Sequence, residues 1–208
     1  MKIQLEDIGK RYGKHWLFRH FNAEFQLNDR IGIKGINGSG KSTLLQLIAG
    51  ICLPSEGQLT YTDEEGKNID LNDLAGHLSL LSPYMDVPEQ LNLKELFDFQ
   101  EKILPFREGI DLNEFLEITL LKGFENNFIK QYSSGMKQRL KLGLSFLGSS
   151  KILFLDEPCS NLDVAGKALY QKLLAEHSSD RIIFIASNEE EVELINCTGI
   201  YNLNELNT

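Results

Sequence analysis

The chain has 208 residues, of which 42% are hydrophobic and 25% charged, a composition typical of one globular domain with a buried core. Its formal net charge of −9 argues against a sequence-independent grip on nucleic acid and against direct adhesion to anionic lipid, because both need a basic face. No apolar run approaches the roughly 18–20 residues of a membrane-spanning helix, and the N-terminus lacks the apolar stretch of a signal peptide. Three widely spaced cysteines, Cys52, Cys159 and Cys197, indicate free thiols in a reducing compartment.

Alternating apolar and polar residues, together with short apolar runs, predict several strands in the first part of the chain. The expected strands are 1–8, 22–27, 30–34, 58–62 and 78–82, and a helix is expected at 41–49. The sequence Leu-Pro-Ser-Glu-Gly at 53–57 separates that helix from the next strand, because proline and glycine end helices.

The spacing of apolar residues becomes helical between residues 86 and 147. Helical segments are expected near 93–103, 111–121 and 136–147, followed by strands 152–155, 181–186 and 199–203 and by helices 164–177 and 189–195. Strands and helices that alternate on both sides of a helical block indicate an α/β fold with an inserted helical subdomain. We expect a single domain over 1–208, with a core of about 1–83 and 148–208 and a helical subdomain of about 84–147.

Residues 35–42 read Gly-Ile-Asn-Gly-Ser-Gly-Lys-Ser and fill every required position of the phosphate-loop pattern G-x-x-x-x-G-K-[ST]. The loop follows a predicted strand and opens a predicted helix, so backbone N–H groups and the positive end of the helix dipole face one point. The predicted nucleotide-binding residues of this loop are Asn37, Gly38, Ser39, Gly40, Lys41, Ser42 and Thr43. Lys41 is expected to reach the β- and γ-phosphates, and the Ser42 hydroxyl is expected to bind Mg²⁺.

Four apolar residues followed by Asp156-Glu157-Pro158 form a second signal. A carboxylate at the end of a buried strand can lie beside the phosphate loop, where Asp156 would hold Mg²⁺ directly or through water. The next carboxylate, Glu157, can accept a proton from an attacking water molecule. An acidic pair at a strand end is also common by chance, so this interpretation depends on the phosphate loop nearby.

Between these motifs lies Tyr132-Ser133-Ser134-Gly135-Met136, directly before an apolar-periodic helix. Hydroxyl groups at this point are typical of a helix N-cap and turn. The same arrangement also makes a second phosphate-binding corner, because hydroxyl and amide donors gather at a helix N-terminus. The residues alone leave both interpretations open.

The order and spacing of these motifs resemble those of an ABC-type ATPase, the ATP-binding subunit of ABC transporters. The resemblance rests on the phosphate loop, on the element at 133–140, on Leu-Asp-Glu-Pro at 155–158 and on Ser-Asn-Leu-Asp at 160–163, and it covers essentially the whole chain. It implies a phosphate-loop NTPase core with a mixed or parallel sheet, an N-terminal antiparallel β layer and an inserted α-helical subdomain. The short chain is similar to exporter-like bacterial subunits, including the haem-exporter subgroup.

The resemblance assigns roles to further residues. Tyr12 corresponds to the aromatic residue that stacks on adenine, whereas Trp16 is expected to pack in the antiparallel layer. Ser133 and Gly135 correspond to the serine and second glycine of the signature element, which face the γ-phosphate bound by the opposite subunit. Asp163 corresponds to an aspartate that crosses the dimer interface, although by itself it would be interpreted as a helix N-cap.

The signature element and the loop before the helical block both depart from the family pattern. Ser134 and Met136 stand where the family usually has glycine and glutamine, so at Ser134 a Cβ enters where backbone approaches phosphate. We expect a mild alteration, because the Ser134 hydroxyl can itself donate. In the loop, Ser82 or Pro83 occupies the place of a glutamine that binds Mg²⁺, and only Ser82 offers a side-chain oxygen.

A third departure concerns catalysis. Asn188 stands where the family places a histidine that contacts the γ-phosphate and orients the water. Asparagine donates a hydrogen bond but cannot take or carry a proton. Losing one transition-state contact costs about 10²–10³-fold in rate. We therefore expect hydrolysis that is slow but not abolished, since Glu157 remains.

The resemblance implies an ATPase that uses ATP and Mg²⁺ and dimerises head-to-tail, as a homodimer or heterodimer, to power transport of a solute. The helical block would contact an integral membrane permease subunit around 84–96, which would hold the chain at the inner, cytoplasmic face of the cell membrane without insertion. A first alternative is a slow-hydrolysing switch or clamp. A second is a soluble, non-transport ABC protein, although such proteins usually carry two ATPase cores, a long coiled-coil insertion or basic segments.

Overall fold

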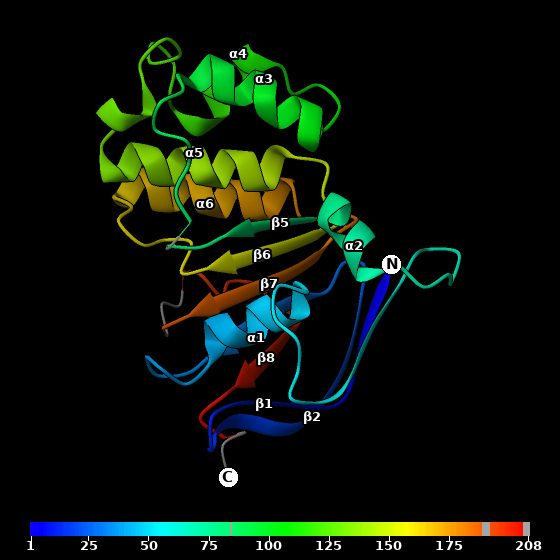
Figure 1. The fold of residues 1–208 in the computed structure, drawn as a ribbon. Helices are drawn as coiled ribbons and strands as arrows, with labels where there is room; N and C mark the ends of the chain where they lie inside the picture. The colour runs from blue at the N-terminus through cyan, green and yellow to red at the C-terminus, as the bar shows by residue number, and fades with distance from the viewer. Residues whose placement is uncertain (84, 189–191, 206–208) are drawn as a thin grey trace.

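The structure is a computed structural model that describes residues 1–83, 85–188 and 192–205. Its strands form two sheets (Figure 1). The first is antiparallel with the order β2-β1-β4, and it consists of β1 (Lys2–Tyr12), β2 (His15–Gln26) and β4 (Glu56–Thr62). The expected N-terminal antiparallel layer is thereby confirmed.

The second sheet has five strands in the order β5-β6-β7-β3-β8, and all of its pairings are parallel. Its strands are β3 (Arg30–Lys34), β5 (Leu78–Leu81), β6 (Ile152–Asp156), β7 (Ile182–Ser187) and β8 (Gly199–Asn202). Lys34 pairs with Ser187 and Asp156 pairs with Ala186, so the carboxyl ends of β3, β6 and β7 share one edge. The α/β fold class is confirmed, with a parallel central sheet.

Helices cover this sheet and form the block between β5 and β6. They are α1 (Lys41–Ile48), α2 (Leu71–Leu74), η1 (Ala75–His77), α3 (Leu93–Ile103), α4 (Leu112–Thr119), η2 (Ile129–Gln131), α5 (Ser134–Leu147) and α6 (Val164–Glu176). Side-chain oxygens of Asn92, Asp111, Ser133 and Asp163 accept the third N–H of α3, α4, α5 and α6. These N-caps explain where the four helices begin.

Alternate side chains of β6 and β7 enter two separate cores, as the two-residue period of a strand requires. Leu153 and Leu155 pack with α5 and α6 in one core, whereas Phe154 and Phe184 pack with α1 and the antiparallel sheet in the other. The rings of Phe154 and Phe184 stack with centroids 5.1 Å apart, and Phe25 of β2 meets Phe184 edge-on at 4.9 Å. Figure 1 shows α3 and α4 beyond α5, on the side remote from the antiparallel sheet.

The first hairpin is longer than the sequence predicts. β1 continues to Tyr12 and β2 begins at His15, and these two residues pair across the turn. The expected strands ended at residue 8 and began at residue 22 because polar and basic residues interrupt the alternation between them. Pairing of the backbone extends the ladder regardless of that interruption.

Two further local predictions differ from the structure. The short helix α2 was not expected; it begins at the N-cap Asp70, whose side chain accepts the N–H of Asn72. Of the helix expected at 189–195, residues 192–195 form turns, and residues 189–191 lie outside the described residues. In this segment the Glu193 carbonyl accepts a hydrogen bond from the Tyr170 hydroxyl, so tertiary contacts replace helical ones.

Candidate nucleotide-binding site

The carboxyl edge of the parallel sheet opens into a cleft of about 590 Å³. The residues that line it come from separate segments of the chain: Tyr12, Leu17, Asn37, Gly38, Gly40, Lys41, Ser42, Thr43, Pro83, Asp156, Glu157 and Asn188. The sheet gathers them because β3, β6 and β7 end side by side. The structure thus brings together the predicted phosphate loop, the two carboxylates, Asn188 and Tyr12.

The phosphate loop bends where glycine occupies left-handed positions. Gly38 has φ of 84° and Gly40 has φ of 100°, a region that strains residues with a side chain. Gly40 is also the N-cap of α1 and offers no side chain to the N–H groups of the first turn, which can therefore donate to an anion. The Ser39 hydroxyl does not line the cleft; it lies behind the loop, beside Gly35, buried and without a hydrogen-bond partner. This loop fits a phosphate group.

Lys41 is buried, and its ammonium group folds back onto its own loop. Nζ donates to the carbonyl oxygens of Gly35 at 2.8 Å and of Ile36 at 3.2 Å. Burial lowers the pKa of Lys41, while the carboxylates of Glu157 and Asp156 act in the opposite direction. Phosphate oxygens in place of these carbonyls would give the ammonium a charged hydrogen-bond partner.

Asp156 ends β6 and accepts a hydrogen bond from the Ser42 hydroxyl. Burial raises the pKa of Asp156, and the hydrogen bond from Ser42 opposes this effect. Mg²⁺ is typically bound by one or two protein oxygens, with water and substrate phosphates completing its coordination. A carboxylate and a hydroxyl in contact beside a phosphate loop are a donor set that fits Mg²⁺.

Glu157 follows in a left-handed conformation, with φ of 47°, which is uncommon for a residue other than glycine. Its N–H donates to the Ala186 carbonyl at 2.9 Å and ties the turn to β7. Its carboxylate accepts hydrogen bonds from the Asn188 amide and, at 3.2 Å, from the Ser160 hydroxyl. Asn188 therefore contacts the candidate base directly and can orient it, although it cannot carry a proton.

The two aromatic residues of the hairpin occupy different environments. Tyr12 is 57% exposed and lines the cleft, with the Lys10 ammonium 5.3 Å from its ring centroid. Trp16 does not line the cleft; the guanidinium groups of Arg11 and Arg19 lie 5.3 and 4.3 Å from its ring centroid. Tyr12 is thus placed to stack on a base, and Trp16 packs in the antiparallel layer as expected.

Residues 133–136, which we term the signature corner, lie at the start of α5 and do not line the cleft. The Ser133 hydroxyl accepts the N–H of Met136 at 3.2 Å, so in this structure it caps the helix. Ser133 and Ser134 are exposed, and a Cβ on Gly135 would lie 3.5 Å from the Asn161 carbonyl oxygen. The chain does not bring its own signature corner to its own phosphate loop.

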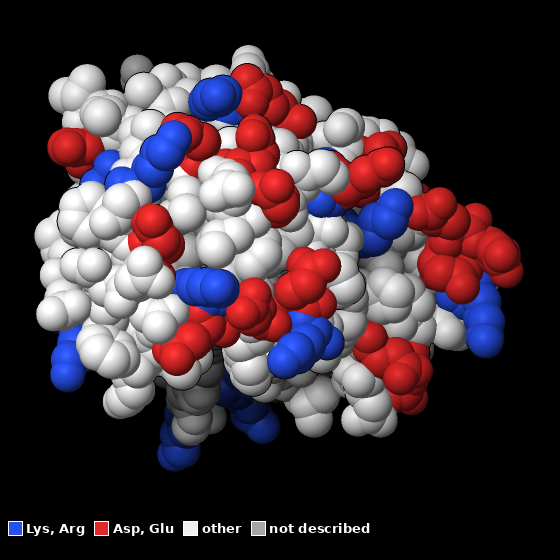
Figure 2. All heavy atoms as spheres, turned by 90° about the horizontal axis from the view of Figure 1, so that it is seen from above, with Lys and Arg blue, Asp and Glu red and all other residues white. Residues whose placement is uncertain are grey.

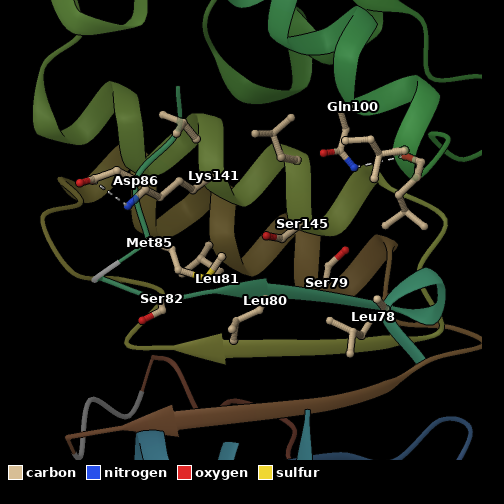
Figure 3. Close-up of a pocket in the computed structure, with 15 residues that line it drawn as sticks. Leu78, Ser79, Leu80, Leu81, Ser82, Met85, Asp86, Gln100, Lys141 and Ser145 are labelled. Carbon is tan, nitrogen blue, oxygen red and sulfur yellow. Dashed lines mark hydrogen bonds and ion pairs between the residues drawn. The ribbon is translucent and has the colours of Figure 1, made fainter. Parts of the chain in front are cut away.

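Two other predicted residues also lie away from the cleft. Asp163 caps α6, with Oδ1 accepting the N–H of Gly166 at 2.8 Å. Ser82 is buried and lines a neighbouring pocket between β5, α3 and α5, whereas Pro83 lines the nucleotide cleft (Figure 3). In Figure 3 the Ser82 hydroxyl points to the same side of β5 as Leu80, opposite to Leu81. The contact between the Ser82 oxygen and Mg²⁺ stays a prediction.

Three residues that contact the turn after β6 were not predicted from the sequence as site residues. Ser160 contacts the Glu157 carboxylate, Gln138 donates to the Pro158 carbonyl, and the Glu193 carboxylate accepts a backbone N–H of the same turn. Ser160 lies within a motif that the sequence shows. The spacing of Gln138 and Glu193 gives no sign that they meet, because they are distant in the chain.

A phosphate loop at the edge of a parallel sheet, a carboxylate pair on the neighbouring strand and a signature corner on an inserted helical block define an ABC-type ATPase. A family model described as "ABC transporter" matches residues 18–160, and the chain belongs to this family.

Known proteins resemble the chain along most of its length. It is 29% identical over 192 residues to the cytochrome c biogenesis ATP-binding export protein CcmA of Haemophilus influenzae, covering 92% of this chain and 90% of that protein. It is 28% identical over 199 residues to the spermidine/putrescine import ATP-binding protein PotA of Clostridioides difficile, covering 91% of this chain and 56% of that protein. The solved structure of a putative ABC transporter ATP-binding protein from Pyrococcus furiosus has the same fold, with a TM-score of 0.82, 21% identity and full coverage of both chains.

Proposed function

We propose that this chain is an ATP-binding and ATP-hydrolysing subunit that dimerises around ATP and powers transport of a solute by separate membrane subunits. One observation carries the proposal: the phosphate loop and the signature corner both offer phosphate-binding donors, yet one chain holds them apart. A second subunit arranged head-to-tail would bring its signature corner to the first subunit's phosphate loop.

Within one cleft, Lys41 and the first-turn N–H groups of α1 bind the phosphates, and Tyr12 stacks on the base. Ser42 and Asp156 hold Mg²⁺, which neutralises phosphate charge when bound. Glu157 accepts the proton of the attacking water while Asn188 and Ser160 hold its carboxylate. The products are ADP and phosphate.

The opposite subunit completes the site. Its Ser133 and Ser134 hydroxyls and the N-terminus of its α5 donate to the γ-phosphate, and its Asp163 lies at the interface. ATP is then a component of the interface, so its binding stabilises the closed dimer and its hydrolysis opens it.

Replacing Glu157 by glutamine tests this proposal, because the variant keeps the shape of the site and loses the base. With Mg²⁺ and millimolar ATP, Glu157→Gln is expected to elute as a dimer in size-exclusion chromatography with light scattering, and without ATP as a monomer. Glu176→Gln, an exposed position on α6, is the matched control and should behave like the wild type. A Glu157→Gln protein that binds ATP and stays monomeric would contradict the dimer.

The pocket beside β5 supports contact with a membrane subunit. It has a volume of about 260 Å³, and Figure 3 shows Leu81 and Met85 in it, with Lys141 pointing toward Asp86. The Lys141 side chain is only 13% exposed and lies 4.0 Å from the carboxylate of the 89% exposed Asp86. An amphipathic segment of the permease that carries a carboxylate would fit this pocket. Of the predicted contact region 84–96, residue 84 lies outside the described residues.

The charge distribution supports a protein partner on the same side. Figure 2 views the molecule from the side of α3 and α4, and acidic and basic side chains are interspersed over this face. In the described part of the chain no helix combines the length and apolar character needed to cross a bilayer. We propose that the permease holds the chain at the inner, cytoplasmic face of the cell membrane, as in a transporter whose ATP-binding subunit is a separate chain.

Photo-crosslinking from two positions tests the membrane partner. A crosslinker at Ile103, which lines the pocket and is 63% exposed, is expected to capture a polytopic membrane protein in native membranes. The same crosslinker at Ile200, which is 52% exposed on β8, is the control and should not capture it. Equal capture from both positions, or capture of soluble proteins from Ile103, would contradict a membrane partner at this pocket.

A second candidate function is a clamp that closes on ATP and hydrolyses it slowly. The contact between Asn188 and Glu157 favours it, because an amide stands where the family has a group that can carry a proton. Turnover of the purified protein decides between the two. Rapid wild-type hydrolysis that Asn188→His scarcely changes would remove this candidate, whereas a large gain in Asn188→His would support it.

The relatives' names do not agree on what is transported. The Haemophilus influenzae protein is named for cytochrome c biogenesis and the Clostridioides difficile protein for spermidine and putrescine, and both are nearly equally identical in sequence to this chain. The comparison therefore supports the ATP-binding role of this chain and assigns it no solute.

A further inference from the structure

The peptide group between Pro158 and Cys159 is held on both of its polar edges by buried side chains. Its carbonyl oxygen accepts a hydrogen bond from Nε2 of Gln138 at 2.8 Å. Its N–H donates to Oε1 of Glu193, also at 2.8 Å. Gln138 is 7% exposed and Glu193 is 2% exposed, so both hydrogen bonds are shielded from water. Two side chains distant in sequence thus meet at a single peptide plane.

The two side chains arrive from opposite sides of the site. Gln138 lies on α5, one helical turn after Gly135 of the signature corner, and a Cβ on Gly135 would lie 3.5 Å from the Asn161 carbonyl oxygen. Glu193 lies on the segment after β7, and its own carbonyl accepts the Tyr170 hydroxyl of α6 at 2.7 Å. The held peptide therefore connects the signature helix, the segment that follows Asn188, and α6.

This peptide lies one residue after Glu157, within the turn that carries the Glu157 carboxylate. The Ser160 N–H donates to the Glu157 carbonyl at 3.1 Å, and the Leu162 N–H donates to the Cys159 carbonyl at 3.1 Å. Rotation of the held peptide would move both contacts and, through Ser160, the Glu157 carboxylate. Glu157 itself has φ of 47°, and a residue other than glycine keeps such a conformation only when its surroundings impose it.

We propose that Gln138 and Glu193 are positioning residues that fix the turn carrying Glu157 by holding the Pro158–Cys159 peptide. The proposal rests on the proposed function of Glu157 as the base and adds two residues that do not line the nucleotide cleft. It also connects α5 to the catalytic turn, because Gln138 lies one helical turn after Gly135 of the signature corner. Residues that only stabilised the fold would change the melting temperature without a selective effect on turnover.

Three variants test the proposal in the full chain with ATP and Mg²⁺. Gln138→Met keeps the length of the side chain and removes the donor; Glu193→Leu removes the acceptor; Glu193→Gln keeps an acceptor oxygen. Displacement of a catalytic group by about 1 Å costs on the order of 10²-fold in rate, so kcat is expected to fall by about 10- to 100-fold in the first two variants. KM should stay near the wild-type value, and Glu193→Gln should retain most of the wild-type kcat.

A second readout does not depend on hydrolysis. Hydrogen exchange of the Cys159 amide, followed by NMR, is expected to be slow in the wild type and in Glu193→Gln and faster in Glu193→Leu and Gln138→Met. Gln171→Met and Glu176→Leu, both exposed on α6, are the matched controls and should leave kcat and this exchange rate unchanged.

The outcomes separate the two proposals. Wild-type kcat in Gln138→Met and Glu193→Leu overturns the positioning role, even where ATP hydrolysis itself is confirmed. Equal falls in kcat and in the ATP affinity of all three variants also overturn it, because they indicate general loss of structure. If the wild-type chain has no ATPase activity, the proposed function is wrong. If, in addition, the exchange rate of the Cys159 amide is the same in the wild type and in the variants, then Gln138 and Glu193 do not hold this peptide.

Discussion

The phosphate loop and the signature corner are both helix N-termini that offer donors to phosphate, yet they are built differently. At the phosphate loop, the N-cap is Gly40, which supplies no capping side chain, and Lys41 is buried beside it. At the signature corner, Ser133 caps its own helix and is exposed to solvent. The phosphate loop therefore offers uncapped N–H groups and a cation to an anion without the help of a second subunit. At the signature corner, the Met136 N–H is already satisfied by the Ser133 hydroxyl, and in the proposed dimer a nucleotide on the other subunit would compete for these donors.

The largest effect is expected at the buried cation. Lys41→Met removes the ammonium that is proposed to bind the phosphates and should lower ATP turnover by about 10²–10³-fold or more, with weaker nucleotide binding. Steady-state hydrolysis and calorimetric titration with ATP measure both effects. Lys172→Met, at an exposed position on α6, should change neither. Near-normal turnover in Lys41→Met would show that the loop is not the phosphate site.

The signature corner should respond differently. Ser133→Ala is expected to lower turnover by about tenfold, because a hydrogen bond to a charged group contributes about 1.5–3 kcal/mol and neighbouring donors remain. Binding of ATP to the isolated subunit should not change. Asp111→Ala removes the corresponding N-cap of α4 and controls for the stability cost of a lost cap. If Ser133→Ala weakened ATP binding by the monomer, the difference between the two helix N-termini would disappear.

A smaller effect is expected at the base-stacking position. Tyr12→Ala should weaken ATP binding by about tenfold, since stacking on an aromatic ring contributes about 1–3 kcal/mol per base, and Tyr12→Phe should preserve affinity. Fluorescence titration with a nucleotide analogue measures the change. Trp16→Phe should leave the affinity for ATP unaltered. Weaker binding in Trp16→Phe together with unchanged binding in Tyr12→Ala would assign the stacking role to Trp16.

The smallest effect concerns stability without nucleotide. Because burial raises the pKa of Asp156 above its ordinary value of 3.8, the folded chain holds this proton more tightly than the unfolded chain. The charged carboxylate therefore lowers stability as pH rises from 3.8 through the raised pKa, and the penalty persists at neutral pH. Asp156→Asn should raise the thermal midpoint of the nucleotide-free protein slightly at pH 7 and reduce the stabilisation by Mg·ATP. A lower midpoint in nucleotide-free Asp156→Asn would contradict this account.

Short motifs with a local cause could be predicted from the sequence. The phosphate loop needs glycine at its left-handed turns and a strand and a helix on either side, and all of these are local properties of residues 30–49. The apolar run before Asp156 similarly predicts a buried strand that ends in carboxylates. These elements were correctly predicted because few residues within one segment determine them.

Other features depend on neighbours that the sequence does not reveal. The full length of β1 and β2 follows from their pairing with each other, and the turns at 192–195 follow from the contacts of Glu193. At the end of β5, Pro83 lines the nucleotide cleft, whereas Ser82 lines the neighbouring pocket. Strand propensity and helical periodicity describe a segment alone and do not include these tertiary contacts.

By itself, the sequence determined the α/β class, the phosphate loop and the presence of two carboxylates beside it, because backbone conformation and apolar spacing are encoded within a few neighbouring residues. Only the tertiary structure decided that Asn188 meets Glu157, that the signature corner lies outside the cleft of its own chain, and that Gln138 and Glu193 meet at one peptide group. The hydrogen bonds at Glu157, Pro158 and Cys159 join residues between 20 and 34 positions apart, and their distances are set by sheet order and helix packing rather than by local preference.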